Sequence, residues 1–412
     1  MVGQPAAAAA SKVRRRPRDR RRQILHHASE LFSGSGFHAV RMEDIAEATG
    51  ITARALYRHF ENKQDLLSHV ILDDQSRLLA ALDDPAGRRM TTSADLEALL
   101  RRLIEASLDS LRLGPLWQRE ARHLAAADFA RVRAGTRRIG RAVCEGIQNA
   151  DHTTSPFQAE VRAWAAVSIV TSPGHYEPTL ARRKLADLLL AASLAAISAP
   201  ACGEEDTPNR PAQCNLPRAH NSRREQLIAA AVRAFRERGF GGVSLDEFGI
   251  AGPAVYRYFD SKADILSNLV TRLQDWTALE NTRALRKAVD DATVIGELVR
   301  GYIRIAVEAT DLLAVAVTEA LYLPDKAAER ERRIRNDDIA EWARWLRVTR
   351  PHLPDPAAQA LAYATKTVIN DLVRVPHLTQ NSAFCPELVS CALTTLLTTE
   401  LPRKARHTHP QR

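Results

Sequence analysis

Apolar residues near the amino end recur every three to four positions between residues 20 and 32, which predicts an amphipathic helix. A second, short helix is expected over residues 42–48, and Gly50 supplies a tight turn after it. Thr52 is a good N-cap for a third helix over residues 53–59. A helix, a glycine turn and a second helix at this spacing predict a helix-turn-helix.

The remainder of the chain has the same helical period, and no segment alternates apolar and polar residues as a strand would. The fold is therefore expected to be all-α. The periodic segments cover residues 96–113, 116–130, 157–170, 180–197, 294–310, 312–323, 334–348 and 357–374.

The pattern occurs twice. Residues 50–63 closely match residues 249–262, and Tyr57 aligns with Tyr256 at an offset of 256 − 57 = 199 residues. The same offset aligns Trp164 with Tyr363. A constant offset over more than 100 residues predicts a duplication of a whole helical unit.

The second copy is shortened in its helix-turn-helix. Phe32 matches Phe235 at an offset of 203, so four residues are missing between Phe240 and Tyr256. About one helical turn is lost, and bulky Phe248 stands nearest the gap. We expect the second head to bind DNA weakly or not at all, although both heads would bind if the shorter turn is tolerated.

A proline-rich stretch over residues 198–220 predicts a connector between the copies. The expected domains are an arm, a helix-turn-helix, a body, a linker, a degenerate helix-turn-helix, a second body and a tail. Their residues are 1–17, 18–64, 65–199, 200–219, 220–263, 264–402 and 403–412.

Charge is concentrated where nucleic acid would lie. The chain has 412 residues and a formal net charge of +9, of which the balance between Lys12 and Lys63 is +6. A phosphate-binding arm is favoured over a merely solvated tail because a predicted reading head follows it directly. The basic residues of the arm are Lys12, Arg14, Arg15, Arg16, Arg18, Arg20, Arg21 and Arg22.

The motif over residues 45–67 resembles the signature of the TetR (tetracycline-repressor) family. The resemblance implies a DNA-binding regulator, with Arg54 and Arg58 reaching base edges or phosphates and small Ala53 and Ala55 allowing close approach. The DNA-binding candidates are Arg41, Thr52, Ala53, Arg54, Ala55, Tyr57, Arg58, His59 and Lys63, and in the second copy Pro253, Tyr256, Arg257, Tyr258 and Lys262.

The family also implies an inducer site and a four-helix dimer interface. Residues 157–170 and 180–197 would pack against residues 357–374 and 386–399, which makes the chain a built-in pseudo-dimer. The pocket candidates Trp117, Glu120, His123, Glu319, Tyr322 and Trp342 could equally be core residues or partners of arginines.

Other functions are less well supported by the sequence. No P-loop, GxSxG, HExxH or dinucleotide fingerprint occurs, so we expect no enzyme, cofactor or metal. The five cysteines are scattered and the longest apolar run is too short for a membrane span, which predicts a cytoplasmic protein. A ligand-responsive repressor that binds operator DNA, either as one chain or as a homodimer, is favoured over a helical adaptor with vestigial heads.

Overall fold

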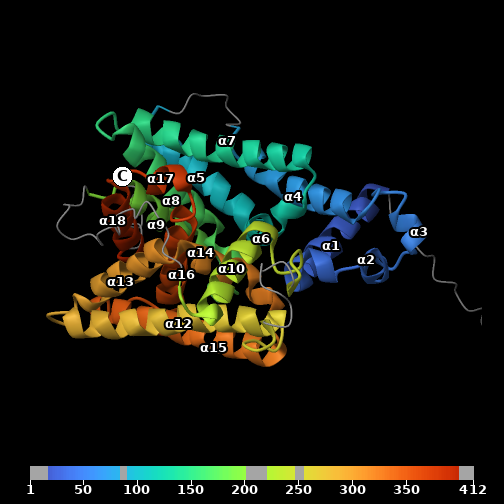
Figure 1. Ribbon diagram of the computed structural model, residues 1–412. Helices are drawn as coiled ribbons and strands as arrows, with labels where there is room; N and C mark the ends of the chain where they lie inside the picture. Colours follow the sequence, from blue (N-terminus) through green and yellow to red (C-terminus); the bar gives the residue numbers. More distant parts are fainter. Residues whose placement is uncertain (1–16, 84–90, 201–219, 246–254, 399–412) are drawn as a thin grey trace, which may run out of the picture.

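The computed structural model describes residues 17–83, 91–200, 220–245 and 255–398, and all regular structure in these ranges is helical (Figure 1). None of the helices in this part of the chain is long and apolar enough to cross a membrane. We refer to residues 17–200 as the first unit and to residues 220–398 as the second unit.

The first head consists of α1 (Pro17–Ala39), α2 (Met42–Thr49) and α3 (Ala53–Leu56). Helix α1 is longer than the sequence predicted, but Gly36 interrupts its helical geometry with a φ of 77°. Ile24 and Phe32 of α1 are fully buried and pack the head together. In Figure 1 the head projects from the remainder of the molecule at the right.

The first body is a bundle of helices that follows directly. Its elements are α4 (Lys63–Ala80), α5 (Ser93–Leu108), α6 (Leu113–Glu120), the 3-10 turn η1 (Ala121–His123), α7 (Ala126–Ala150), α8 (Pro156–Thr171), η2 (Ser172–His175) and α9 (Arg182–Ile197).

The second unit follows the same order. Its elements are α10 (Arg223–Arg238), α12 (Lys262–Lys287), α13 (Val294–Glu308), α14 (Thr310–Glu319), η5 (Ala320–Tyr322), α15 (Asp325–Thr349), α16 (Asp355–Leu372), α17 (Pro376–Thr379) and α18 (Phe384–Leu396). Helix α15 begins and ends 199 residues after α7, since 325 − 126 and 349 − 150 are both 199. The two bodies therefore keep the sequence offset as a structural correspondence.

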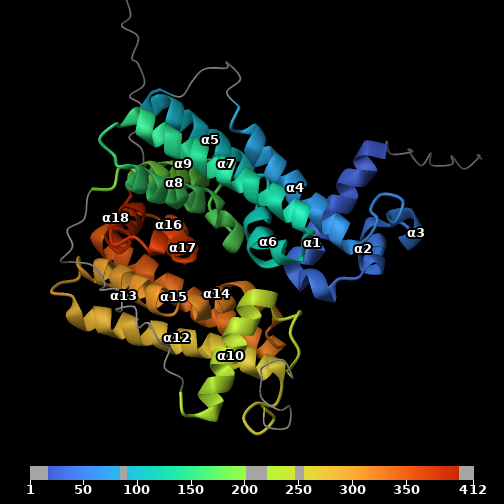
Figure 2. The same ribbon diagram turned by 45° about the horizontal axis from the view of Figure 1, so that its top comes forward.

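The units meet through four helices, because α8 packs against α16 and α9 packs against α18 (Figure 2). Alanines with no exposed surface, among them Ala163 and Ala362, lie in this region and allow helix axes to approach closely. A buried ion pair crosses it, with Arg162 Nε 2.5 Å from Glu387 Oε1. Arg162 also donates to the Ile197 carbonyl at 3.0 Å, so its charge is well satisfied.

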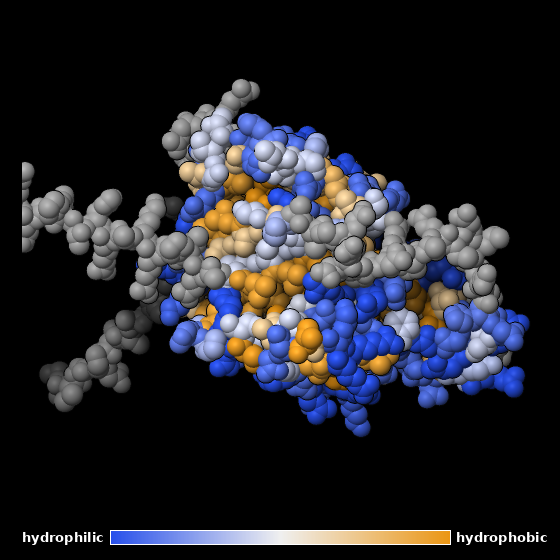
Figure 3. All heavy atoms as spheres, turned by 90° about the vertical axis from the view of Figure 1, so that its left-hand side faces the viewer, coloured by the Kyte–Doolittle hydropathy of each residue, from blue (hydrophilic) through white to orange (hydrophobic). Residues whose placement is uncertain are grey.

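The end of the molecule opposite the first head has a different surface character. On the face seen in Figure 3, apolar residues gather around the centre and hydrophilic residues surround them.

Candidate nucleic-acid interface

The turn between α2 and α3 is set by local hydrogen bonds. Gly50 adopts the left-handed conformation, with φ 68° and ψ 38°, which glycine reaches without steric cost. The amide of Ile51 donates to the Ala46 carbonyl at 2.9 Å. The Thr52 hydroxyl accepts the Ala55 amide at 3.2 Å and caps α3, as the sequence predicted.

Helix α3 is anchored on one side only. Leu56 has no exposed surface and Phe60 is 1 % exposed, so the inner side of the α3 segment is fixed to the head. Tyr57 is 49 % exposed. The other exposed candidates in this segment are Thr52, Arg54, Arg58 and His59.

Arg54 and Arg58 carry the free charge of this surface. Neither guanidinium forms a hydrogen bond or an ion pair with any residue that the structure describes. Ala53 and Ala55, on either side of Arg54, are half-buried. This arrangement matches what direct reading of a major groove requires.

Arg41 is exposed but already engaged. Its Nη2 lies 2.8 Å from Asp44 Oδ1, and its backbone amide donates to Asp44 Oδ2 at 2.8 Å. The hydrogen bond to Asp44 raises the pKa of the Arg41 guanidinium. Arg41 thus stands at the N-cap position of α2 with Asp44 as its acceptor, and a DNA contact from its side chain would have to compete with Asp44.

Lys63 has a structural role that the sequence did not predict. Its Nζ donates to the carbonyls of Phe37 and Val40 at 2.7 and 2.9 Å and lies 4.4 Å from the centre of the Phe37 ring. Burial lowers the pKa of Lys63. Two of three donors are used inside the head, so at most one is left for a phosphate.

The second head repeats this internal framework. Lys262 Nζ donates to the carbonyls of Phe240 and Val243 at 2.7 and 2.8 Å. The arginine–aromatic contacts are also equivalent, because Arg21 lies 5.1 Å from the Phe60 ring and Arg224 lies 5.2 Å from the Phe259 ring.

The described residues include only part of the second head. Tyr256, Arg257 and Tyr258 are exposed. Pro253, Phe248 and the shortened helix of the second head lie outside the described residues, as do most of the basic arm and the linker. The weak binding of the second head therefore stays a prediction.

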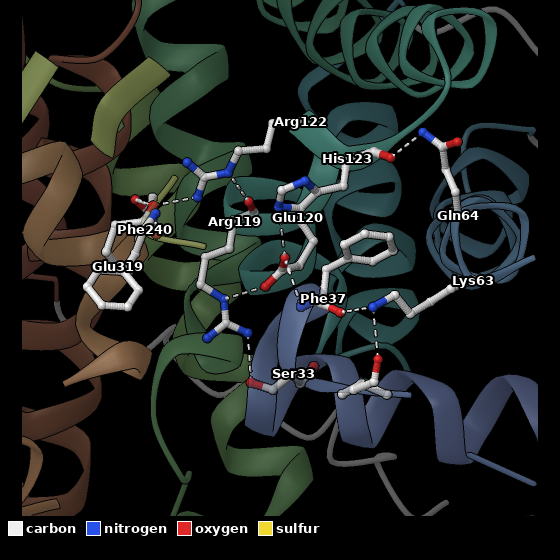
Figure 4. A network of polar contacts seen from close by, with 12 residues as sticks. Ser33, Phe37, Lys63, Gln64, Arg119, Glu120, Arg122, His123, Phe240 and Glu319 are labelled. Carbon is white, nitrogen blue, oxygen red and sulfur yellow. Dashed lines mark hydrogen bonds and ion pairs between the residues drawn. The ribbon is translucent and has the colours of Figure 1, made fainter. Parts of the chain in front are cut away.

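A buried carboxylate connects the first head to its body. Glu120, at the end of α6, is 1 % exposed, and its Oε2 accepts the Phe37 amide at 3.2 Å (Figure 4). Burial raises the pKa of Glu120. Arg119 donates to the Ser33 carbonyl at 2.7 Å, and His123 stacks on the Phe37 ring with centroids 4.8 Å apart.

The same network crosses between units. Glu319 accepts the Phe240 amide at 2.9 Å, as Glu120 accepts that of Phe37. The Arg122 guanidinium from the first unit forms an ion pair with Glu319 and donates to the Phe235 carbonyl at 3.3 Å. Arg122 thus connects the first body directly to the second head.

Two cavities of about 520 and 530 Å³ lie in the first and second bodies. Of the six predicted pocket residues only Trp117 lines one of them, in the first body. Glu120, His123, Glu319 and Tyr322 belong to the head–body junctions instead. Trp342 has no exposed surface and is a core residue.

Charged residues of the second cavity were not among the sequence-based candidates. Glu331, Asp338 and Lys366 line it. A signal for them exists in the repeat, because the 199-residue offset aligns Glu331 with Val132 and Lys366 with Val167. Apolar positions that become charged within a repeated helix mark a change in what the helix faces.

Known proteins resemble this chain in both heads. The model of bacterial regulatory proteins of the tetR family matches residues 24–70 and 227–269. The HTH-type transcriptional regulator UidR of Escherichia coli K12 is 42 % identical over 65 residues, which are 16 % of this chain and 33 % of that protein. The repressor KstR2 of Rhodococcus jostii RHA1 is 31 % identical over 107 residues, or 26 % and 52 % of the two chains.

A third relative, the HTH-type activator FasR of Mycolicibacterium smegmatis, is 35 % identical over 96 residues, 23 % of this chain and 42 % of that one. This chain therefore spans about half or less of the length of these relatives. A solved TetR-family regulator from Bordetella parapertussis 12822 matches with a TM-score of 0.39 and 20 % identity, over 43 % of this chain and 94 % of that one. The region described by the tetR-family model therefore occurs twice in this chain, once in each head.

Proposed function

We propose that this protein is a sequence-specific DNA-binding transcriptional regulator that reads DNA mainly through α3 of the first head. The observation that carries the proposal is the exposed pair Arg54 and Arg58, which have no partner among the described residues. They extend from a segment anchored by the buried Leu56 and Phe60. Arginine is the side chain that most often pairs with guanine in the major groove.

The other exposed side chains would fix the position of α3 on the duplex. Tyr57 and His59 are suited to phosphate contacts, which orient a protein without reading bases. The basic residues at the start of α1 would add sequence-independent attraction. Binding should therefore weaken steeply as salt rises, since phosphate contacts release counterions.

A ligand in the first cavity would act on the head through α6. Trp117 lines the cavity and Glu120 lies one turn further along the same helix, where it binds the Phe37 amide. The Phe37 carbonyl in turn binds Lys63, which begins the helix after α3. A small rotation of α6 on ligand binding would shift α3 and release DNA, which describes a ligand-responsive repressor.

The four-helix contact of α8, α9, α16 and α18 would serve as the dimer interface within one chain. The two heads would then occupy the positions that the heads of two separate chains occupy in a dimer. If the second head is inert, a two-fold operator needs the first heads of two chains. Association of two chains on DNA is therefore part of the proposal.

Binding to the DNA upstream of the protein's own gene tests the proposal. We expect a retarded complex at low salt that Arg58→Ala weakens strongly, whereas Arg183→Ala, which removes an equal charge from an exposed position on α9, does not. Equal, small effects of both variants would mean non-specific attraction. No complex with the folded protein would favour a helical adaptor with vestigial heads.

A further inference from the structure

The two cavities occupy equivalent places in the two bodies. At the 199-residue offset, Val132, Thr136, Ile139 and Val167 of the first cavity correspond to Glu331, Arg335, Asp338 and Lys366 of the second. All eight residues line their respective cavities. The volumes are almost equal, about 520 and 530 Å³, so the difference between the sites is chemical.

The first cavity is mainly apolar and aromatic. Trp117, Phe129 and Trp164 line it together with aliphatic side chains from α5, α7 and α8. Its charged lining residues are Asp371 and three arginines, a formal balance of +2. Each of those arginines is already hydrogen-bonded, for example Arg236 to Asp311 at 2.5 Å.

The second cavity has the opposite charge. Five carboxylates line it, but only two cationic side chains, Arg335 and Lys366, which gives a formal balance of −3. Two of the five, Glu341 and Asp371, are paired with Arg344 and Arg374, which lie outside the lining, so the free negative charge belongs to the other three. His175 of the first unit also lines the cavity, and burial lowers its pKa. The neutral imidazole therefore does not offset the negative charge near neutral pH.

Lys366 indicates which charge this cavity stabilises. Its Nζ lies 2.6 Å from Asp338 Oδ2 and 3.7 Å from the centre of the Tyr302 ring. The Trp342 ring centre is 4.5 Å away. Carboxylates and aromatic faces together favour a cation, and this surrounding keeps an ammonium group in a largely buried position.

Glu331 is a partly buried carboxylate without a strong partner. Its side chain is 15 % exposed, and its nearest cation is the Arg335 guanidinium at 3.6 Å. It accepts no hydrogen bond from any described residue. Burial raises its pKa. A buried carboxylate that lacks a hydrogen bond is stabilised by a cation placed beside it.

We propose that the second cavity binds a small molecule that carries a protonated amine or quaternary ammonium group on an apolar body. Glu331 would lie beside the positive nitrogen, and Leu273, Leu313 and Ile334 would contact the apolar part. The inference deepens the proposed function, on which it rests for the role of the ligand. It makes the two bodies sensors of different chemical classes.

Residues from each unit complete the cavity of the other. Gln118 and His175 of the first unit line the second cavity, whereas Arg236 and Arg374 of the second unit line the first. Asp371 lines both, and its Oδ1 accepts Gln118 at 2.8 Å and Arg374 at 2.7 Å. A cation in the second cavity therefore acts on a wall that the first body shares.

Calorimetric titration of the full chain with decylammonium, decanoate and decanol tests the inference, because the three probes differ only in the head group. Glu331→Gln removes the charge with little change of shape, and Asp337→Asn does so at an exposed wall position. Glu329→Gln is the matched control, exposed on α15 and absent from the cavity lining.

We expect Glu331→Gln to weaken decylammonium binding about tenfold, a typical value for one partly solvated charge pair. Asp337→Asn should weaken it less, Glu329→Gln should leave it unchanged, and decanol binding should not respond to any of them. Decylammonium affinity that ignores Glu331→Gln, or decanoate that binds more tightly and responds to this variant, would overturn the inference. Titration without DNA separates this result from failure of the proposed regulator function.

Discussion

Val167 in the first body faces a cavity lined by two tryptophans, whereas the equivalent Lys366 in the second body lies among carboxylates and aromatic rings. The head–body junctions differ much less, since Glu120 and Glu319 bind equivalent amides. The contacts that hold each head on its body are thus kept in both copies, whereas the residues that line the two cavities have changed. The two copies therefore differ more in their cavity linings than in the contacts between head and body.

The largest expected effect concerns the contact that makes the units unequal. Arg122→Met leaves the fully buried Glu319 without its cation. We expect a loss of about 3–5 kcal/mol in the free energy of unfolding, because an unpaired buried charge is costly. Denaturant titration measures it. The double variant Arg122→Met with Glu319→Gln should recover much of the loss, and no recovery would contradict the assigned role of the pair.

The two head lysines should be equivalent for stability but not for function. Lys63→Met and Lys262→Met each deprive two backbone carbonyls of a donor. Each variant should lose about 2–3 kcal/mol of head stability, measured by hydrogen exchange of the head amides. Only Lys63→Met should also weaken DNA binding. Loss of DNA binding from both variants would mean that both heads read DNA.

Arginine substitutions test the difference between the heads more directly. Arg58→Ala should cost about 1–3 kcal/mol of binding free energy for a specific DNA site, and Arg257→Ala should cost much less. Fluorescence anisotropy with a labelled duplex measures both. Both residues are exposed, so neither change should alter folding. Equal losses would refute an inert second head.

The smallest effect distinguishes His123 from Tyr322, which occupies the equivalent position. Burial and then the positive charges nearby lower the pKa of His123 to about 4. Because this value lies below the ordinary one, stability should be complete above pH 6.5 and fall as the pH drops towards 4. We expect His123→Phe to reduce that fall by about 1 kcal/mol near pH 5. An unchanged pH profile of unfolding would contradict the buried, neutral imidazole.

The fold was largely accessible from sequence because it depends on periodicity and local turn chemistry. Thr52 as a cap, Gly50 as the turn and the buried Leu56 all follow from patterns within a few residues. The 199-residue offset predicted a correspondence that α7 and α15 reproduce. Helix α1 is assigned to Ala39, but its helical geometry breaks at Gly36, a few residues after the end expected from the apolar pattern.

The site was less accessible because side-chain roles depend on three-dimensional neighbours. Lys63 was a DNA-binding candidate, but two carbonyls 23 and 26 residues earlier accept two of its three donors. Glu120 and Glu319 looked like pocket residues, but backbone amides from the heads occupy them. Only an alignment of the two copies position by position would have drawn attention to Glu331 and Lys366.

The ion pair between Arg162 and Glu387 has no counterpart at the equivalent positions, which hold Leu361 and Leu188. In a pair of first units joined through these helices, Arg162 would face a leucine and lack its carboxylate. In a pair of second units, Glu387 would likewise face a leucine and lack its arginine. Association of two identical units is therefore disfavoured, and a first unit associates with a second unit. Duplication followed by the appearance of this one ion pair would change a surface that pairs with an identical copy of itself. The resulting surface of each unit would pair only with the other unit of the chain.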